Sequence, residues 1–297
     1  SGSDVLNVDD TGDSVGRTGT LTATTISGLG MDGSIKYDTV ETLNISLGSG
    51  RDTFNVYGTF SSTETTITTD PADPGSLGTI GNTINVGNPG RTLNDIAGRL
   101  VLLGSSQYDV VNVDDSADDV PNTGELSASQ LLGLSMGSAD QTAVNYAEGI
   151  EYWGLEELNI WLGTNDDNFT VLDTDGHNSA LPNLFGGAWA AGQGSLTAAD
   201  GAHVALDNTV VVDELAHTLT FSAAHGFSSD DLVTFARETG ADNSGLIDGA
   251  TYLVVAIDSN TIQLRQSATT NVYGGPGEDY IQIDNVSQQT NIFGGQN

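Results

Sequence analysis

The chain of 297 residues contains no cysteine and very few basic residues. Without cysteine it can form no disulfide bond, no thiolate metal site and no thiol nucleophile. Seven Lys and Arg stand against 40 Asp and Glu, and the net charge is −33. This charge excludes nucleic-acid partners, which need a basic face, and it disfavours docking to anionic membranes.

The sequence also lacks segments for targeting or membrane insertion. No run approaches the roughly 20 apolar residues of a membrane span, and no basic-then-apolar leader stands at the N-terminus. The chain begins and ends inside repeated motifs, at residues 1–8 and 290–297. We therefore expect a segment of a longer array, with targeting signals elsewhere. No long amphipathic helix is predicted.

The acidic residues are mostly aspartate, with 30 Asp against 10 Glu. Asp is favoured in turns, and it chelates calcium from turns. Several Asp residues stand in adjacent pairs, at 9–10, 114–115, 118–119, 166–167 and 230–231. Like charges this close repel each other unless a cation or water screens them. The pairs are therefore candidate cation sites or parts of a solvated acidic surface.

A short frame recurs along the chain: Asp or Asn, any residue, an apolar residue, usually Asn, then Val or Ile. It begins at Asp4, Asp52, Asn82, Asp109, Asp167 and Asp279. The alternation of apolar residues predicts half-buried strands, and glycine precedes most copies. The Asn at the fourth position (Asn7, Asn55, Asn85, Asn112) forms either an inward ladder or an outward row, and we favour the outward row.

A longer repeat is superimposed on the short one. Residues 4–10 match 109–115, and residues 19–31 match 124–136, both with an offset of 105. Residues 41–48 match 156–163 with an offset of 115, which implies about ten extra residues near 137–149, where a surface loop tolerates them. We call residues 1–103 repeat 1 and residues 104–204 repeat 2.

The residue pattern changes between residues 205 and 269, where short β-strand patterns alternate with turn residues. We expect a small inserted β-sandwich or β-barrel module here, after which residues 270–297 resume the repeat. The spacing of the short frames, about 25–30 residues, predicts wide coils. The expected fold is therefore all-β: a right-handed parallel β-helix or β-roll-like solenoid with one inserted module.

The glycine–Asp frame resembles the RTX (hemolysin-type) calcium-binding repeats, best at residues 274–283 and next best at 48–54. The inserted segment looks like a small β module of giant bacterial adhesin-like surface proteins. In RTX repeats, Asp carboxylates and glycine-turn carbonyls hold calcium between successive turns. The resemblance implies a set of ligands for Ca²⁺ at residues Asp279, Gly274, Gly277, Asp52, Gly48, Gly50, Asp167, Asp166, Asp109 and Asp4. The alternative is that these Asp residues cap their turns by accepting backbone N–H bonds, which requires no metal.

A catalytic site is not expected, because nearly every Asp belongs to a repeat. The aromatic cluster Tyr152, Trp153, Trp161 and Trp189 is either core packing or a glycan platform. The resemblances imply a secreted, calcium-stabilised structural or adhesive segment at the cell surface. Its expected partners are neighbouring repeats of the same chain, and glycans, other surface proteins or further copies are possible partners. The alternatives are a glycan-binding or polysaccharide-acting β-helix, and a calcium-binding export segment of a toxin or hydrolase.

Overall fold

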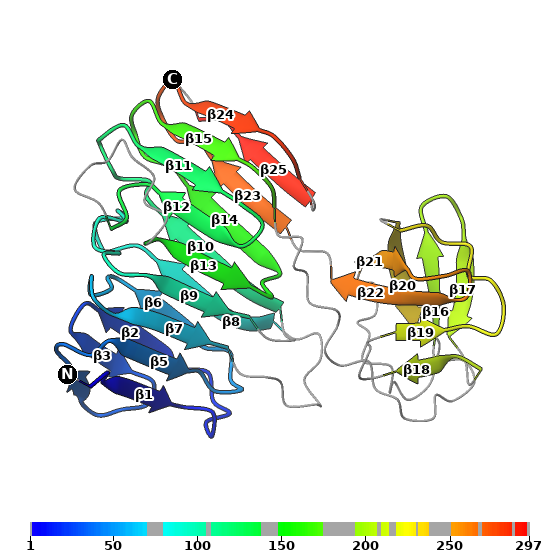
Figure 1. Ribbon diagram of the computed structural model, residues 1–297, viewed down its shortest axis with the longest axis horizontal. Coiled ribbons are helices and arrows are strands. Elements are labelled where there is room, and N and C mark those ends of the chain that lie inside the picture. The colour runs from blue at the N-terminus through cyan, green and yellow to red at the C-terminus, as the bar shows by residue number, and fades with distance from the viewer. Residues whose placement is uncertain are drawn as a thin grey trace. The chain divides into compact units, whose positions relative to one another are not determined.

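The computed structural model describes residues 2–69, 80–104, 108–137, 148–174, 194–206, 209–213, 218–229, 231–237, 251–266, 269–286 and 289–295. These residues form an all-β protein with no helix (Figure 1). Consequently no described helix is long and apolar enough to cross a membrane. The chain divides into two compact units. The first comprises residues 1–72, 79–177 and 268–297, and the second comprises 73–78 and 178–267.

The first unit contains two nine-stranded sheets. Sheet 1 runs, from neighbour to neighbour, β1 (Val5–Asp9), β5 (Thr42–Ser46), β7 (Glu64–Thr68), β9 (Leu100–Leu103), β13 (Ile150–Trp153), β12 (Gln130–Gly133), β11 (Thr123–Leu126), β15 (Asn168–Val171) and β24 (Tyr280–Ile283). Sheet 2 runs β25 (Gln289–Phe293), β23 (Thr269–Tyr273), β14 (Glu157–Trp161), β10 (Tyr108–Asp114), β8 (Ile80–Val86), β6 (Thr53–Val56), β2 (Thr18–Thr22), β3 (Thr25–Gly28) and β4 (Ser34–Lys36).

Most neighbouring strands in these two sheets are parallel, and the chain crosses from one sheet to the other after each strand between β5 and β10. Antiparallel pairs occur where β2, β3 and β4 meet and where β11, β12 and β13 meet. Parallel strands need such crossover connections, because a tight hairpin can join only antiparallel strands.

A single hydrophobic core lies between sheets 1 and 2. Sheet 1 contributes residues such as Leu43 and Phe169, and sheet 2 contributes residues such as Phe54 and Val111, all fully buried. In strands such as β5 and β6 these apolar residues alternate with more exposed ones, as the period of two in the sequence predicts, whereas β9, β12 and β14 each have three consecutive buried residues. The alternation therefore explains why both sheets bury one face.

The long repeat is visible in the strand pairing. In repeat 1, β1 pairs with β5 so that Asn7 lies opposite Asn44. In repeat 2, β10 pairs with β14 so that Asn112 lies opposite Asn159. The first pair belongs to sheet 1 and the second to sheet 2, and the β2–β6 and β11–β15 pairs are exchanged in the same way. Equivalent parts of the two repeats thus occupy opposite sheets.

The second unit contains sheet 3, which is antiparallel. Its order is β17 (His203–Leu206), β16 (Gly194–Ala198), β20 (Leu232–Arg237), β21 (Thr251–Ala256), β22 (Thr261–Gln266), β19 (Thr218–Thr220) and β18 (Val211–Asp213). It has its own core, which includes Leu196, Phe235 and Tyr252. The inserted sheet therefore begins at β16, before residue 205 where the sequence texture changes, and residues 194–204 pair with it rather than with repeat 2.

Separate cores predict separate responses to core mutations. Phe54→Ala removes a ring that is 0% exposed from the first unit, and Phe235→Ala removes one that is 0% exposed from the second. Each change should cost about 3–5 kcal/mol of unfolding free energy, the usual loss for a buried Phe. In differential scanning calorimetry each variant should lower one thermal transition and leave the other in place.

Val15→Ala serves as the control, since this side chain is exposed and its removal should shift neither transition. A common transition that moves equally in both Phe variants would show that the two units unfold as one.

Candidate functional site

The side chains that begin the short frames form a chain of hydrogen bonds across sheet 2. The backbone N–H of Asp52 donates to Asn82 Oδ1 at 2.9 Å, and the N–H of Asn82 donates to Asp109 Oδ1 at 2.8 Å. The N–H of Asp109 in turn donates to Glu156 Oε2 at 2.7 Å. All four side chains are buried. Each acidic or amide side chain thus satisfies a backbone N–H of the neighbouring strand's turn.

Asp52 and Asp167 each accept backbone N–H bonds with both carboxylate oxygens. Asp52 accepts the N–H of Arg17 at 2.7 Å and that of Gly48 at 3.1 Å. Its counterpart Asp167 accepts the N–H of Asn122 at 2.7 Å and that of Gly163 at 2.9 Å. These contacts support the turn-capping interpretation of the frame.

The remaining predicted ligands lie nearer the surface. Asp279 Oδ1 accepts the N–H of Asp167 at 3.2 Å, and Asp166 Oδ1 accepts the N–H of Glu278 at 2.9 Å. Asp4 is exposed, and its N–H donates to Glu41 Oε2 at 2.7 Å, which repeats the contact between Asp109 and Glu156. The same capping scheme therefore includes both the best match to the frame, at Asp279, and the weaker matches at Asp166 and Asp4.

The predicted glycines allow one turn to lie directly on the next. A Cβ at Gly50 would lie 2.4 Å from the carbonyl carbon of Val15, and one at Gly48 would lie 2.2 Å from the oxygen of Asp13. A Cβ at Gly277 would lie 2.8 Å from the oxygen of Asn165. At Gly274 the nearest atom, 2.9 Å away, is Asp279 Oδ2. Gly48, Gly50 and Gly277 are therefore required because the backbones are in contact, whereas at Gly274 the near atom belongs to a side chain that can move.

No group of three or more His, Asp or Glu side chains in the described ranges is arranged to hold a metal ion. The frame carboxylates also have hydrogen-bond partners already. Calcium binding at these residues therefore stays a prediction, and the turns have a metal-free way to satisfy their backbone.

A second acidic group, which the RTX resemblance does not include, lies beside the turn of Asp167. Asp115 is fully buried, and it accepts the N–H of Leu93 at 3.0 Å and the Nδ2 of Asn122 at 3.3 Å. Asp118 is 3% exposed; its Oδ1 accepts the N–H of Val120 at 2.9 Å. Its Oδ2 is buried and has no hydrogen-bond partner among the described residues. Buried carboxylate oxygens without partners are costly, so this oxygen marks a place for a cation or a proton.

Repeat 1 places an arginine in the equivalent group. The 105-residue offset equates Asp10, Asp13 and Arg17 with Asp115, Asp118 and Asn122. Arg17 Nε donates to Asp13 Oδ2 at 2.7 Å, and this bond lowers the pKa of Asp13 below its ordinary value. Repeat 2 has the neutral Asn122 in place of this guanidinium. Aligning the two repeats at this position could have identified the group from sequence.

Burial raises the pKa of carboxylates in both repeats. Burial raises the pKa of Asp115 to about 8, and repulsion from Asp118, Asp167 and Asp114 adds to the rise. Burial also raises the pKa of Asp167 to about 6. In repeat 1, burial raises the pKa of Asp10 and that of Asp52.

The Asn residues of the short frame form a continuous hydrogen-bonded ladder on the outer face of sheet 2. From Asn85 onward, each Nδ2 donates at 2.8–2.9 Å to the Oδ1 of the preceding amide in the series Asn55, Asn85, Asn112, Asn159, Asn271 and Asn291. Their neighbours along each strand, such as Phe54 and Val56, point into the core. This confirms the outward row. Asn7 and Asn44 form the same contact in sheet 1.

An aromatic stack lies beside this ladder. Trp161 stacks on Tyr273 with ring centroids 5.0 Å apart, and Tyr273 stacks on Phe293 at 4.7 Å. The sequence contains a signal for this stack, because each of the three aromatic residues follows an Asn and an apolar residue.

The described members of the predicted aromatic cluster do not lie together, although the burial of Tyr152 agrees with core packing. Tyr152 is buried in the core, while Trp153 lies on β13 of sheet 1 and Trp161 on β14 of sheet 2. Trp189 lies outside the described residues. The error arises because residues close in sequence fall on strands of different sheets.

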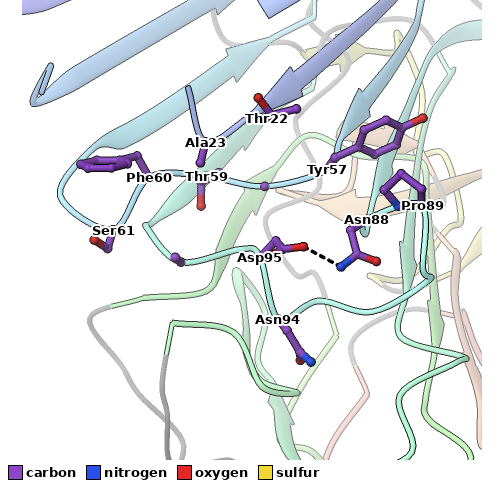
Figure 2. A pocket seen from close by; sticks show the side chains of 12 residues that line it. Thr22, Ala23, Tyr57, Thr59, Phe60, Ser61, Asn88, Pro89, Asn94 and Asp95 are labelled. Carbon is purple, nitrogen blue, oxygen red and sulfur yellow. Dashed lines mark hydrogen bonds between the residues drawn. The ribbon is translucent and has the colours of Figure 1, made fainter. Parts of the chain in front are cut away.

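Two cavities adjoin the outer face of sheet 2, and both are lined in part by Asn88. One, of about 530 Å³, lies beside Tyr57 and Phe60 (Figure 2). Figure 2 shows Tyr57, Asn88 and Pro89 together at one end of it, with Asn88 Nδ2 donating to Asp95 Oδ2 at 2.6 Å. The other, of about 460 Å³, is lined by Trp161 and by the ladder residues Asn85 and Asn112.

Comparison of the chain with protein-family models, with curated proteins and with solved structures finds no match. The function must therefore be argued from these residues alone.

The raised pKa of Asp115 predicts a pH-dependent stability in the absence of metal. Between the ordinary value of 3.8 and the folded value of about 8, the unfolded chain releases a proton that the folded chain retains. The free energy of unfolding should therefore fall as the pH rises through this window. In EDTA, thermal melts of the first unit should show a lower melting temperature at about pH 8 than at about pH 5.

Asp115→Asn should flatten this decline, because the amide does not titrate. Asp38→Asn, an exposed Asp in the same unit, is the control and should keep the slope of the original protein. An unchanged slope in Asp115→Asn would contradict the assignment of the titration to Asp115.

Proposed function

We propose that the chain is a structural, adhesive-type segment of a large secreted surface protein, built as a right-handed β-solenoid. The crossing of the chain between sheets 1 and 2 at each strand from β5 to β10 supports the solenoid, since each return adds one strand to each sheet. Parallel crossovers of this kind are right-handed in nearly all proteins.

One observation carries the proposal: the in-register ladder is resumed across the inserted unit. Asn159 and Asn271 are 112 residues apart in sequence, yet Asn271 Nδ2 donates to Asn159 Oδ1 at 2.8 Å. The strands β14 and β23 pair over five residues without a shift. An architecture that holds its register around an insertion supports a scaffold that carries modules along its length.

The last strands support neighbouring repeats as partners. Three apolar side chains on β24 and β25, Tyr280, Ile283 and Phe293, are 60%, 48% and 46% exposed. Among the described residues β24 and β25 are the outermost strands of their sheets, and a neighbouring repeat packed against them would cover these side chains. We propose no catalytic role, because the acidic side chains serve as repeated turn caps rather than as a single departure from the repeat.

Calcium is part of the proposal at one place. Asp118 Oδ2 is buried without a partner among the described residues, and the charge of Asp118 raises the pKa of both Asp115 and Asp167 in addition to their burial. Calcium prefers carboxylate and carbonyl oxygens. In repeat 1, Arg17 donates to Asp13 Oδ2, the oxygen equivalent to Asp118 Oδ2, although Asp10 Oδ2 is also buried without a partner among the described residues. Because Arg17 supplies a positive charge there, we expect the calcium requirement in repeat 2 alone. A secreted chain meets calcium only after export, which links this site to the compartment.

Calcium titration with thermal melts tests this assignment. At calcium concentrations about 100-fold above Kd, binding adds about 2.7 kcal/mol, which corresponds to a rise of roughly 5–10 °C for a unit of this size. The variant Asn122→Arg/Ser135→Gly copies Arg17 and Gly30 of repeat 1. It should raise the melting temperature in EDTA and abolish the calcium-dependent rise.

The reverse variant Arg17→Asn should create a second calcium-dependent rise in the melting temperature. Arg51→Asn makes the same charge change at an exposed site in the same repeat and should not. If the original protein melts identically in EDTA and calcium, the calcium assignment is wrong and the turns are held by their hydrogen bonds alone.

A further inference from the structure

The aromatic stack on sheet 2 ends at an open ring face. The ring planes of Trp161 and Tyr273 differ by 5° and those of Tyr273 and Phe293 by 10°, with centroid separations close to the spacing of neighbouring strands. The rings therefore stand face to face along the ladder. One face of Trp161 covers Tyr273, and the opposite face points toward β10.

The two strands beyond Trp161 supply no ring. Its partner on β10 is Asp114, whose Oδ1 accepts the N–H of Ser116 at 3.1 Å. The next position in the row is Gly87, which directly follows β8 and has a φ of +138°. A Cβ there would lie 2.6 Å from the oxygen of Asp114, so a larger residue is disfavoured. The row therefore has a notch next to Trp161, and this notch is the cavity of about 460 Å³.

Polar groups surround the notch on the remaining sides. Asn85 and Asn112 each use one of two amide N–H groups in the ladder, so a second N–H and an oxygen lone pair remain on each. At the rim, Arg91 Nε donates to Asp114 Oδ2 at 3.1 Å, which leaves the other guanidinium donors. An apolar ring face with amide, carboxylate and guanidinium groups around it suits a ligand that has one apolar face and many hydroxyl groups.

We propose that this notch binds a neutral saccharide ring, which stacks on the open face of Trp161 and hydrogen-bonds to Asn85, Asn112 and the Arg91–Asp114 pair. The net charge of −33 opposes phosphates and uronic acids, so nucleotides and acidic glycans are disfavoured. The adjoining cavity beside Tyr57 continues the site past Asn88 and gives room for further sugar rings. The site does not depend on the calcium assignment or on the solenoid.

Isothermal titration calorimetry with the full chain tests this proposal. The neutral probes are cellohexaose, maltohexaose and chitohexaose, and hexagalacturonate is the acidic probe. At least one neutral probe should bind with a Kd between about 10 μM and 1 mM, and hexagalacturonate should bind at least roughly tenfold more weakly. Trp161→Ala should weaken binding of the neutral probe by about tenfold or more, since it removes the stacking face.

Asp114→Tyr is a second variant that keeps Trp161 but covers its open face with a new ring, and it should block binding equally. Phe293→Ala removes a ring from the far end of the same stack and should bind within about twofold of the original protein. Circular dichroism melts check that each variant is folded. Binding by none of the neutral probes, or unchanged binding in Asp114→Tyr, would overturn the proposal, as would an equal loss in Phe293→Ala.

Discussion

The structure of the first unit depends on satisfying backbone groups at turns that lie directly on one another. Parallel strands in register bring their turns into contact, and each turn then buries N–H groups that water cannot reach. Short acidic and amide side chains at the start of the strands accept those N–H bonds, as in the series from Asp52 to Glu156. Glycine is needed in the same turns because a Cβ would collide with the neighbouring backbone. Asp and Asn provide most of these acceptors, and Glu156 and Glu41 accept N–H groups in the same way.

The same constraint explains an energetic difference between the two repeats. Stacked carboxylates solve the hydrogen-bonding problem but bring like charges together in a poorly solvated place. Repeat 1 reduces the repulsion with Arg17, whereas repeat 2 has Asn122 and holds Asp115 with a pKa of about 8. The two halves share the same strand register, but Asp115 is fully buried whereas its counterpart Asp10 is only half-buried, and repeat 2 lacks the arginine.

The short frame predicted much of this arrangement, because a period of two places every side chain on one face or the other. The buried Phe54 and Val56 and the outward Asn55 follow directly from it. The period does not reveal to which sheet a strand belongs, so Trp153 and Trp161 were wrongly placed together. Composition also marked the start of the inserted unit too late, since the pattern around β16 and β17 resembles that of the repeats. The acidic group of Asp115 and Asp118 was visible as adjacent pairs, but its burial depends on the fold.

The exchange of sheets between the repeats has a consequence for any longer array. The pair β1–β5 lies in sheet 1 and its counterpart β10–β14 lies in sheet 2. If successive repeats follow the same rule, equivalent outer surfaces lie on opposite sheets in neighbouring repeats. A surface feature encoded once per repeat would then alternate between two opposite sides and return to the same side only after every second repeat. Such an array would present the same repeated surface on both of its sheet faces, and each face could contact a different partner.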